Sequence, residues 1–154
     1  MADLRIVADD LSGEQTARLI DFHLADMHRW SPPESVHAMP RDRLVRPDIS
    51  FFTAWQGDEI AGCGALKQLE PDQGEVKSMR VAPPFLRQGV GEAILLHLMA
   101  EARARGYARL SLETGRPDEF AAARTLYSKH GFSACPPFGT YTDDGFSLCM
   151  SRAL

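Results

Sequence analysis

Three strand-like segments follow one another with only short turns between them, and this arrangement limits the folds open to the chain. The segments are residues 49–56, 60–69 and 75–81. Gly57-Asp58 and the stretch 72–74 between them are typical turn sequences. Strands joined by such short links pair in antiparallel fashion, because parallel neighbours need a long crossover. The sequence therefore predicts an antiparallel meander in the middle of the chain.

A strand and a helix precede this meander. Residues 4–8 read as a short strand, and the spacing of Ser12 to Gln15 predicts a capping box that opens a helix. Ile20, Leu24 and Met27 recur at helical spacing and predict one buried face, with His23 on the helix surface and an end near His28 or Arg29. Two prolines, Pro32 and Pro33, then require a loop, which a second short helix follows.

Helices and strands alternate after the meander. A helix is predicted over 92–105, ending at Gly106, and a strand over 110–114. A second helix begins near Pro117 and stops at Gly131, and residues 146–152 form a closing strand. The predicted fold is α/β (α+β), with a central, mostly antiparallel sheet that has helices on both faces.

Composition narrows the class of protein further. The 154 residues are 44% hydrophobic and 25% charged and show no internal repeat, so we expect a single domain over 1–154. A net charge of -4 gives no general attraction to nucleic acid or to anionic membranes. We find no membrane span or signal peptide. Three cysteines without a C-x-x-C pair argue against a disulfide framework or a thiolate metal site, and favour a cytoplasmic location.

The segment from Met79 to Glu92 is the most informative part of the sequence. It combines a strand, a loop and a helix start, and it contains Gly89 and Gly91. Free amides at such a helix start, together with the helix dipole, bind phosphate or pyrophosphate, and Arg87 adds a guanidinium. Ordinary turn glycines are an equally good reading of this pattern taken alone.

A dinucleotide site is one nucleotide-binding alternative. Glu113 lies at a strand end 24 residues after Gly89, near the position of a ribose-binding acid in such folds. However, Ile94 replaces the third glycine of the G-x-G-x-x-G motif, and the preceding strands form a meander rather than parallel crossover units. The sequence disfavours this alternative.

The chain resembles the GNAT superfamily of acyl-CoA-dependent N-acyltransferases over nearly its whole length, and specifically a bacterial subgroup with poorly defined acceptors. The order and spacing of several segments carry the resemblance. They are 75–81 followed by Arg87-Gln88-Gly89-Val90-Gly91, then 109–114, then 123–132, together with 31–37 and 112–115. One departure is Leu86, which stands where the family loop has Gln or Arg.

The resemblance implies a splayed sheet with acetyl-CoA lying in its opening. The pyrophosphate would be held by backbone amides of Arg87, Gln88, Gly89, Val90, Gly91 and Glu92. The pantetheine arm would pair with the backbone of β-strand residues Met79 and Val81, and an amide near Met79 or Arg80 would polarise the thioester carbonyl. No metal is implied.

The implied reaction is direct attack of an amine on the thioester. An amine with a pKa near about 10.4 costs roughly 4 kcal/mol to deprotonate at neutral pH, so a base is needed. Glu75 lies beside the strand residues that would hold the thioester, and it is the candidate base, acting directly or through water. The alternative interpretation is that Glu75 is a solvated strand carboxylate with no catalytic role. Glu113 is the reserve candidate, with a structural role as its alternative.

Tyr127 fits the family's general-acid position for the leaving thiolate, although its spacing with Phe120 and Ala123 also fits a buried aromatic residue. A Cys135 nucleophile would require an acyl-enzyme intermediate, and free cysteines are more often buried hydrophobes. Direct transfer is therefore the preferred mechanism.

The acceptor is expected to be an amine of a small molecule or an amino-acid-like compound. His28 and His37 flank the Pro-Pro loop that borders the acceptor cavity in the resembled family, and they are the candidate substrate contacts. Five aromatic residues fit either the cavity wall or the ordinary core: Trp30, Phe51, Phe52, Phe138 and Tyr141. A CoA-sensing or protein-binding regulatory module on the same fold is the alternative function. A homodimer is compatible with the resemblance.

Overall fold

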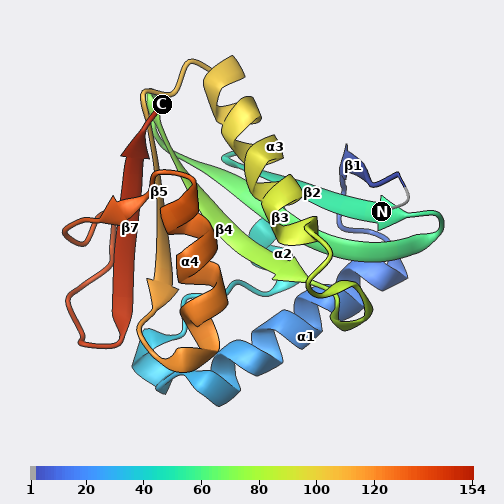
Figure 1. The fold of residues 1–154 in the computed structure, drawn as a ribbon, viewed down its shortest axis with the longest axis horizontal. Helices are drawn as coiled ribbons and strands as arrows, with labels where there is room; N and C mark the ends of the chain where they lie inside the picture. The colour runs from blue at the N-terminus through green and yellow to red at the C-terminus, as the bar shows by residue number, and fades with distance from the viewer. Residues whose placement is uncertain (1–2) are drawn as a thin grey trace.

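One mixed sheet organises the chain, and the computed structural model describes it over residues 3–154 (Figure 1). The strand order is β1-β2-β3-β4-β5-β7-β6. The strands are β1 Arg5–Ala8, β2 Ile49–Gln56, β3 Glu59–Glu70, β4 Gln73–Val81, β5 Arg109–Gly115, β6 Ser133–Ala134 and β7 Ser147–Ala153. The α-helices are α1 Glu14–Trp30, α2 Arg41–Leu44, α3 Val90–Ala104 and α4 Ala121–Lys129, with single 3-10 turns at Pro33–Ser35, Pro83–Phe85 and Asp118–Phe120.

The predicted meander and fold class are confirmed. β2 pairs antiparallel with β3, and β3 pairs antiparallel with β4; β2 turns into β3 at Gly57, whose φ is 60°. β4 and β5 form the parallel pair of the sheet, because α3 provides the crossover between them. β4 begins at Gln73, two residues before the predicted start.

The parallel pair β4–β5 is short. Its register runs only from Gln73 opposite Arg109 to Val76 opposite Leu112. Beyond that point the two strands separate. In Figure 1, β4 and β5 lie together near the C-terminus of the chain and move apart with increasing distance from it. The rest of β4 is therefore paired with β3 on one edge and open toward β5 on the other, which is the splay implied by the resemblance.

A β-bulge lies at the start of this opening. The register of β4 against β3 shifts between the pairs Cys63–Arg80 and Ala65–Lys77, and Ser78 in the bulge has a positive φ of 55°. Because Cys63 and Ala65 point to the same face of β3, Lys77 and Arg80 also share a face. The bulge therefore brings two cationic side chains to one side of the sheet.

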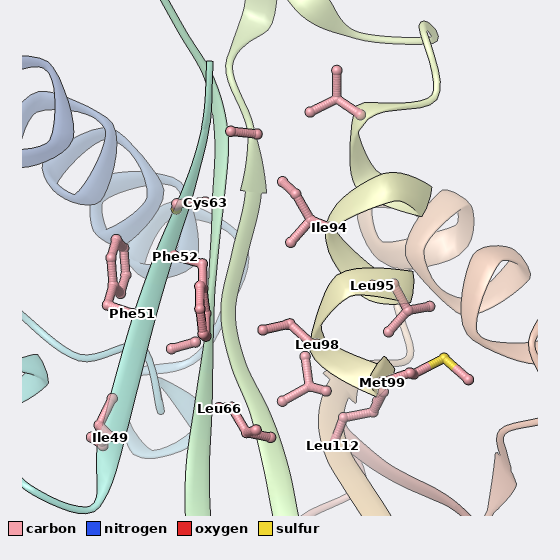
Figure 2. Close-up of a cluster of buried hydrophobic side chains, with 14 of the residues drawn as sticks. Ile49, Phe51, Phe52, Cys63, Leu66, Ile94, Leu95, Leu98, Met99 and Leu112 are labelled. Atoms are coloured by element: carbon pink, nitrogen blue, oxygen red, sulfur yellow. The ribbon is translucent and has the colours of Figure 1, made fainter. Parts of the chain in front are cut away.

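Helices cover both faces of the sheet. On one face, Figure 2 shows Ile94 and Leu98 pointing from α3 toward the strands, where Phe52 and Leu66 also lie. α4 lies beside α3 on this face, with Lys129 paired to Glu92 at 2.6 Å. α1 packs on the opposite face, against β3 and β4. The cavity described below lies where α1, α4 and the open part of the sheet meet.

The start and the inner face of α1 differ from the prediction. The Ser12 hydroxyl donates to Asp10 rather than capping the helix, and Gln15 instead bonds the β2–β3 turn region at Asp58 and Ile60. The capping-box prediction is wrong because Ser12 bonds locally to Asp10, Gln15 bonds the β2–β3 turn region, and Gly13 is the N-cap residue. Ile20 is buried as predicted, whereas Leu24 and Met27 are only half-buried; the other fully buried positions of α1 are Thr16, Leu19 and Asp26.

A substitution at Gly62 tests the close packing of α3 on β3. A Cβ at this position would lie 2.8 Å from both the Arg80 carbonyl oxygen and Ile94 Cδ1. We expect Gly62→Ala to lower the free energy of unfolding by about 1–3 kcal/mol, measured by urea denaturation. Leu96→Ala on the outer side of α3, where Leu96 is 46% exposed, should change it by only about 0.5 kcal/mol. Equal effects would contradict the packing described.

Candidate active site

A cavity of about 650 Å³ opens between the diverging strands. Its wall is formed by one side of α1, the segment after α1, the open halves of β4 and β5, and α4. Residues that the sequence singled out line it together: Glu75, Met79, Arg80, Val81, Gly91, Glu113, Tyr127, Tyr141, Trp30 and His37. The fold therefore places residues predicted to bind the donor and residues predicted to act in catalysis around one cavity.

The glycine loop forms one end of this region. Arg87 and Gly89 both have positive φ, at 61° and 82°, and Gly89 is the residue that precedes α3. None of the amide groups from 87 to 92 donates to a backbone oxygen in the described structure, and the first such bond of α3 is Ala93 to Gly89. Gly91 lines the cavity, whereas residues 87–90 lie outside its wall. The loop therefore presents unpaired donors at the rim, as an anion site requires.

The other end holds a buried carboxylate cluster on β4 and β5. The Glu75 side chain is 3% exposed, and its Oε2 accepts a hydrogen bond from the Tyr141 hydroxyl at 2.5 Å. Lys77 Nζ lies 3.3 Å from the same oxygen and donates to the Tyr141 hydroxyl at 2.9 Å. The alternative of a solvated strand carboxylate is therefore wrong for Glu75. Tyr141 reaches this position from the segment between β6 and β7.

Glu113 faces the same side of the sheet from β5. The parallel register places Glu75 opposite Ser111, and Glu113 follows two residues later on the same face. Burial raises the pKa of Glu113 to about 7, with nearby Glu75 acting in the same direction, while the Ser147 hydroxyl and Lys77 oppose the shift. A carboxyl with a pKa near neutrality suits a general base.

Tyr127 lies on α4 and is 8% exposed. Burial raises its pKa to about 12, and the charge of Glu113 adds to the shift. Its ring packs edge-on against Phe132, with 6.0 Å between the ring centroids. Tyr127 is therefore a buried aromatic residue, as its spacing indicated. It also lines the cavity, and its hydroxyl is protonated at neutral pH.

Arg80 contributes a side-chain role that the sequence analysis missed. Its guanidinium pairs with the buried carboxylate of Asp26, which also binds Arg29. The same guanidinium lies 4.7 Å from the ring centroid of Phe22 and 5.2 Å from that of Trp30. These contacts fix α1 over the bulged part of β4. The signal that could have revealed them is an acidic residue, Asp26, on the apolar side of an otherwise amphipathic helix.

The histidines are placed differently from one another. His37 lines the cavity and packs edge-on against Tyr141 with a centroid separation of 4.8 Å, whereas His28 is exposed and outside the cavity wall. The surface prediction for His23 is wrong: it lines the cavity, and burial, helped by the charge of Arg80, lowers its pKa to about 4. It faces the cavity as a neutral imidazole at physiological pH.

The five aromatic candidates have three different placements. Trp30 and Tyr141 line the cavity, whereas Phe51 and Phe52 belong to the core, as Figure 2 shows. Phe138 lies outside the cavity wall and packs against Tyr141 at 5.1 Å.

The cysteines stand apart from this site. Cys63, Cys135 and Cys149 are free, and none belongs to the cavity wall. Burial raises the pKa of Cys63 to about 12 and that of Cys149 to about 11. Within residues 3–154 there is no group of three metal-ligating side chains, and no helix with the length and hydropathy to cross a membrane.

Comparisons with known proteins identify the family of the chain. The family model described as acetyltransferase (GNAT) family matches residues 16–132. Uncharacterized N-acetyltransferase YsnE of Bacillus subtilis (strain 168) is 48% identical over 98% of this chain and all of its own length. Uncharacterized N-acetyltransferase YedL of Escherichia coli (strain K12) is 44% identical, covering 97% of this chain and 94% of its own. A putative acyl-CoA N-acyltransferase of Klebsiella pneumoniae has a TM-score of 0.78 at 27% identity, covering 100% of this chain and 99% of its own.

The family model and these relatives define an N-acetyltransferase, and the chain belongs to the acetyltransferase (GNAT) family. The expectation of an acetyl-CoA-dependent N-acetyltransferase is confirmed at the level of this class. The similarity also confirms the fold read from the resemblance.

The raised pKa of Glu113 predicts how stability depends on pH. The folded protein holds this proton up to about pH 7, whereas the unfolded chain releases it near the ordinary value of 4.5. Stability therefore falls between these pH values, by about 3 kcal/mol at most, and then stays level. Glu113→Gln should lack this component, so the stability difference between variant and wild type should grow in the variant's favour from pH 4.5 to pH 8.

Urea denaturation at the two pH values measures this difference. Glu70→Gln, at an exposed position near the end of β3, serves as the matched control and should follow the wild type. A constant difference between Glu113→Gln and the wild type would contradict the raised pKa.

Proposed function

We propose that this protein transfers an acetyl group from acetyl-CoA to the amine of a small molecule or amino-acid-like acceptor, by direct attack on the thioester. The observation that carries the proposal is the opening between β4 and β5. Amides of the glycine loop that have no backbone partner among the described residues stand at one side of it, and the carboxylates of buried Glu75 and half-buried Glu113 stand at the other. A donor and an acceptor entering from opposite sides would meet beside the bulge at Ser78.

Three stretches of backbone would hold the donor. The diphosphate binds the amides of Arg87, Gln88, Gly89, Val90, Gly91 and Glu92, with the Arg87 guanidinium replacing the polar side chain that Leu86 lacks. The pantetheine arm lies along the unpaired edge of β4 at Met79 and Val81, where it acts as an added strand. A backbone amide at Met79 or Arg80 binds the thioester oxygen as negative charge develops on it.

The chemical step then needs a proton acceptor and a proton donor. The amine nitrogen bonds to the carbonyl carbon, the C–S bond breaks, and the thiolate takes a proton from the Tyr127 hydroxyl. The proton lost by the amine passes to a carboxylate of the Glu75 and Glu113 pair, directly or through water. The pKa of Glu113 near 7 favours it for this proton, while the bonds of Glu75 to Lys77 and Tyr141 favour an anchoring role for Glu75.

We retain His37 as the candidate substrate contact because it lines the cavity. His28 is exposed and does not line the cavity, so we do not assign it this role. We place the protein in the cytoplasm on the basis of its free cysteines. A homodimer remains an expectation of the family resemblance.

Substitution of the loop glycine tests the donor site. Gly89 has positive φ, and a Cβ there would meet nothing within 4 Å, so a large side chain obstructs a ligand rather than the protein. We expect Gly89→Trp to weaken acetyl-CoA binding by about tenfold or more, measured by calorimetry. Gly57→Trp is a matched control, because Gly57 also has positive φ and open space but lies in the β2–β3 turn. Undiminished affinity in Gly89→Trp would move the diphosphate elsewhere.

Removal of the Tyr127 hydroxyl tests the proton donor. We expect Tyr127→Phe to lower the single-turnover rate of acetyl transfer by about a hundredfold, with acetyl-CoA affinity retained, because only the transition state needs this proton. Tyr107→Phe, at a buried tyrosine outside the cavity, should keep the wild-type rate. An unchanged rate in Tyr127→Phe would show that Tyr127 contributes to packing and does not donate the proton.

A further inference from the structure

The acceptor end of the cavity contains an ion pair built into one strand. Glu75 and Lys77 are two residues apart on β4, so their side chains share a face, and both line the cavity. Their side chains are 3% and 10% exposed. Tyr141 bonds to both of them, and the Lys77 ammonium lies 5.5 Å from its ring centroid. The three groups form a fixed unit from two distant parts of the chain.

Each charged member of this unit has hydrogen-bonding capacity left over. Both bonds to Glu75 converge on Oε2, and Oε1 has no partner among residues 3–154. The Lys77 ammonium has three N–H donors, of which one goes to Tyr141 and one to Glu75. One oxygen of the anion and one donor of the cation therefore have no partner among the described residues, and both residues line the cavity.

An ion pair with these two free positions complements a molecule that carries both charges. The ammonium group of such a molecule binds Glu75 Oε1. A carboxylate bonded to the carbon that carries this ammonium group binds the third N–H of Lys77. An acceptor with an ammonium group alone would instead bring its charge next to the buried Lys77 cation. We infer that the acceptor is a zwitterionic amino carboxylate, with Lys77 as the residue that selects its carboxylate; this inference rests on the proposed function.

The rest of the wall indicates the side chain of such an acceptor. Trp30 and Phe120 pack edge-on with a centroid separation of 6.1 Å, and Phe146 packs on Phe120 at 5.7 Å. All three line the cavity. Aromatic walls of this kind favour an apolar side chain, and a phenyl ring is a suitable probe.

Three compounds that differ only at the carboxylate test the inference. Phenylalanine, phenylalaninamide and phenethylamine are offered as acceptors, and thiol release from acetyl-CoA gives kcat/KM for each. The wild type should prefer phenylalanine by about tenfold or more over the other two. Lys77→Met should lose this preference through a fall with phenylalanine alone, whereas Lys77→Arg should retain much of it.

The outcomes separate this inference from the proposed function. A wild-type rate with phenethylamine equal to or above that with phenylalanine overturns the inference, as does an equal fall for all three compounds in a folded Lys77→Met. If acetyl-CoA binds but no compound is turned over, the inference is overturned and the proposed donor site is retained. If acetyl-CoA does not bind, the proposed function is overturned. Where Lys77→Met does not fold, the double variant Glu75→Gln/Lys77→Met removes the pair without a buried unpaired charge, and the same loss of preference is expected.

Discussion

The early end of pairing between β4 and β5 determines most of what is distinctive in this structure. A strand inside a sheet normally satisfies its backbone groups on both edges, because unpaired buried amides and carbonyls are costly. Here the ladder stops at Val76 and Leu112, and the remainder of β4 keeps one open edge. The opening leaves room for a ligand that pairs with this edge, and it separates the strands so that the side chains on one face border a cavity.

Two ion pairs that involve residues of β4 lie at the wall of that cavity. Arg80 and Asp26 connect the strand to α1, while Lys77 and Glu75 form a pair within the strand that Tyr141 closes. The bulge at Ser78 brings both cations to one face, which regular alternation along the strand would have prevented. The placement of charge in the site thus follows from one extra residue in β4.

Much of the framework was predictable because it depends on local patterns. Turn residues, together with β-branched and aromatic residues, located the three meander strands. Gly106 marked the end of α3, whose start at Val90 lies two residues before the predicted Glu92. The capping of α1 was not predictable from spacing, because Gln15 has partners more than forty residues away.

The candidate site was predictable in its chain segments but not in its contacts. Glu75, Glu113 and Tyr127 were singled out from the family resemblance, and the cavity brings them together. The partnership of Lys77 with Tyr141 crosses 64 residues, so no local pattern could reveal it. Similarly, helical spacing predicted His23 as a surface residue, whereas the position of α1 over β4 leaves it half-buried.

A crystal structure of the protein with bound CoA would show whether the β4–β5 opening is the donor site. We expect the diphosphate on the amides of residues 87–92, and the pantetheine arm along the open edge of β4, with its sulfur between Tyr127 and the bulge at Ser78. A β4–β5 opening filled by the protein's own side chains, with CoA bound on another surface, would contradict it.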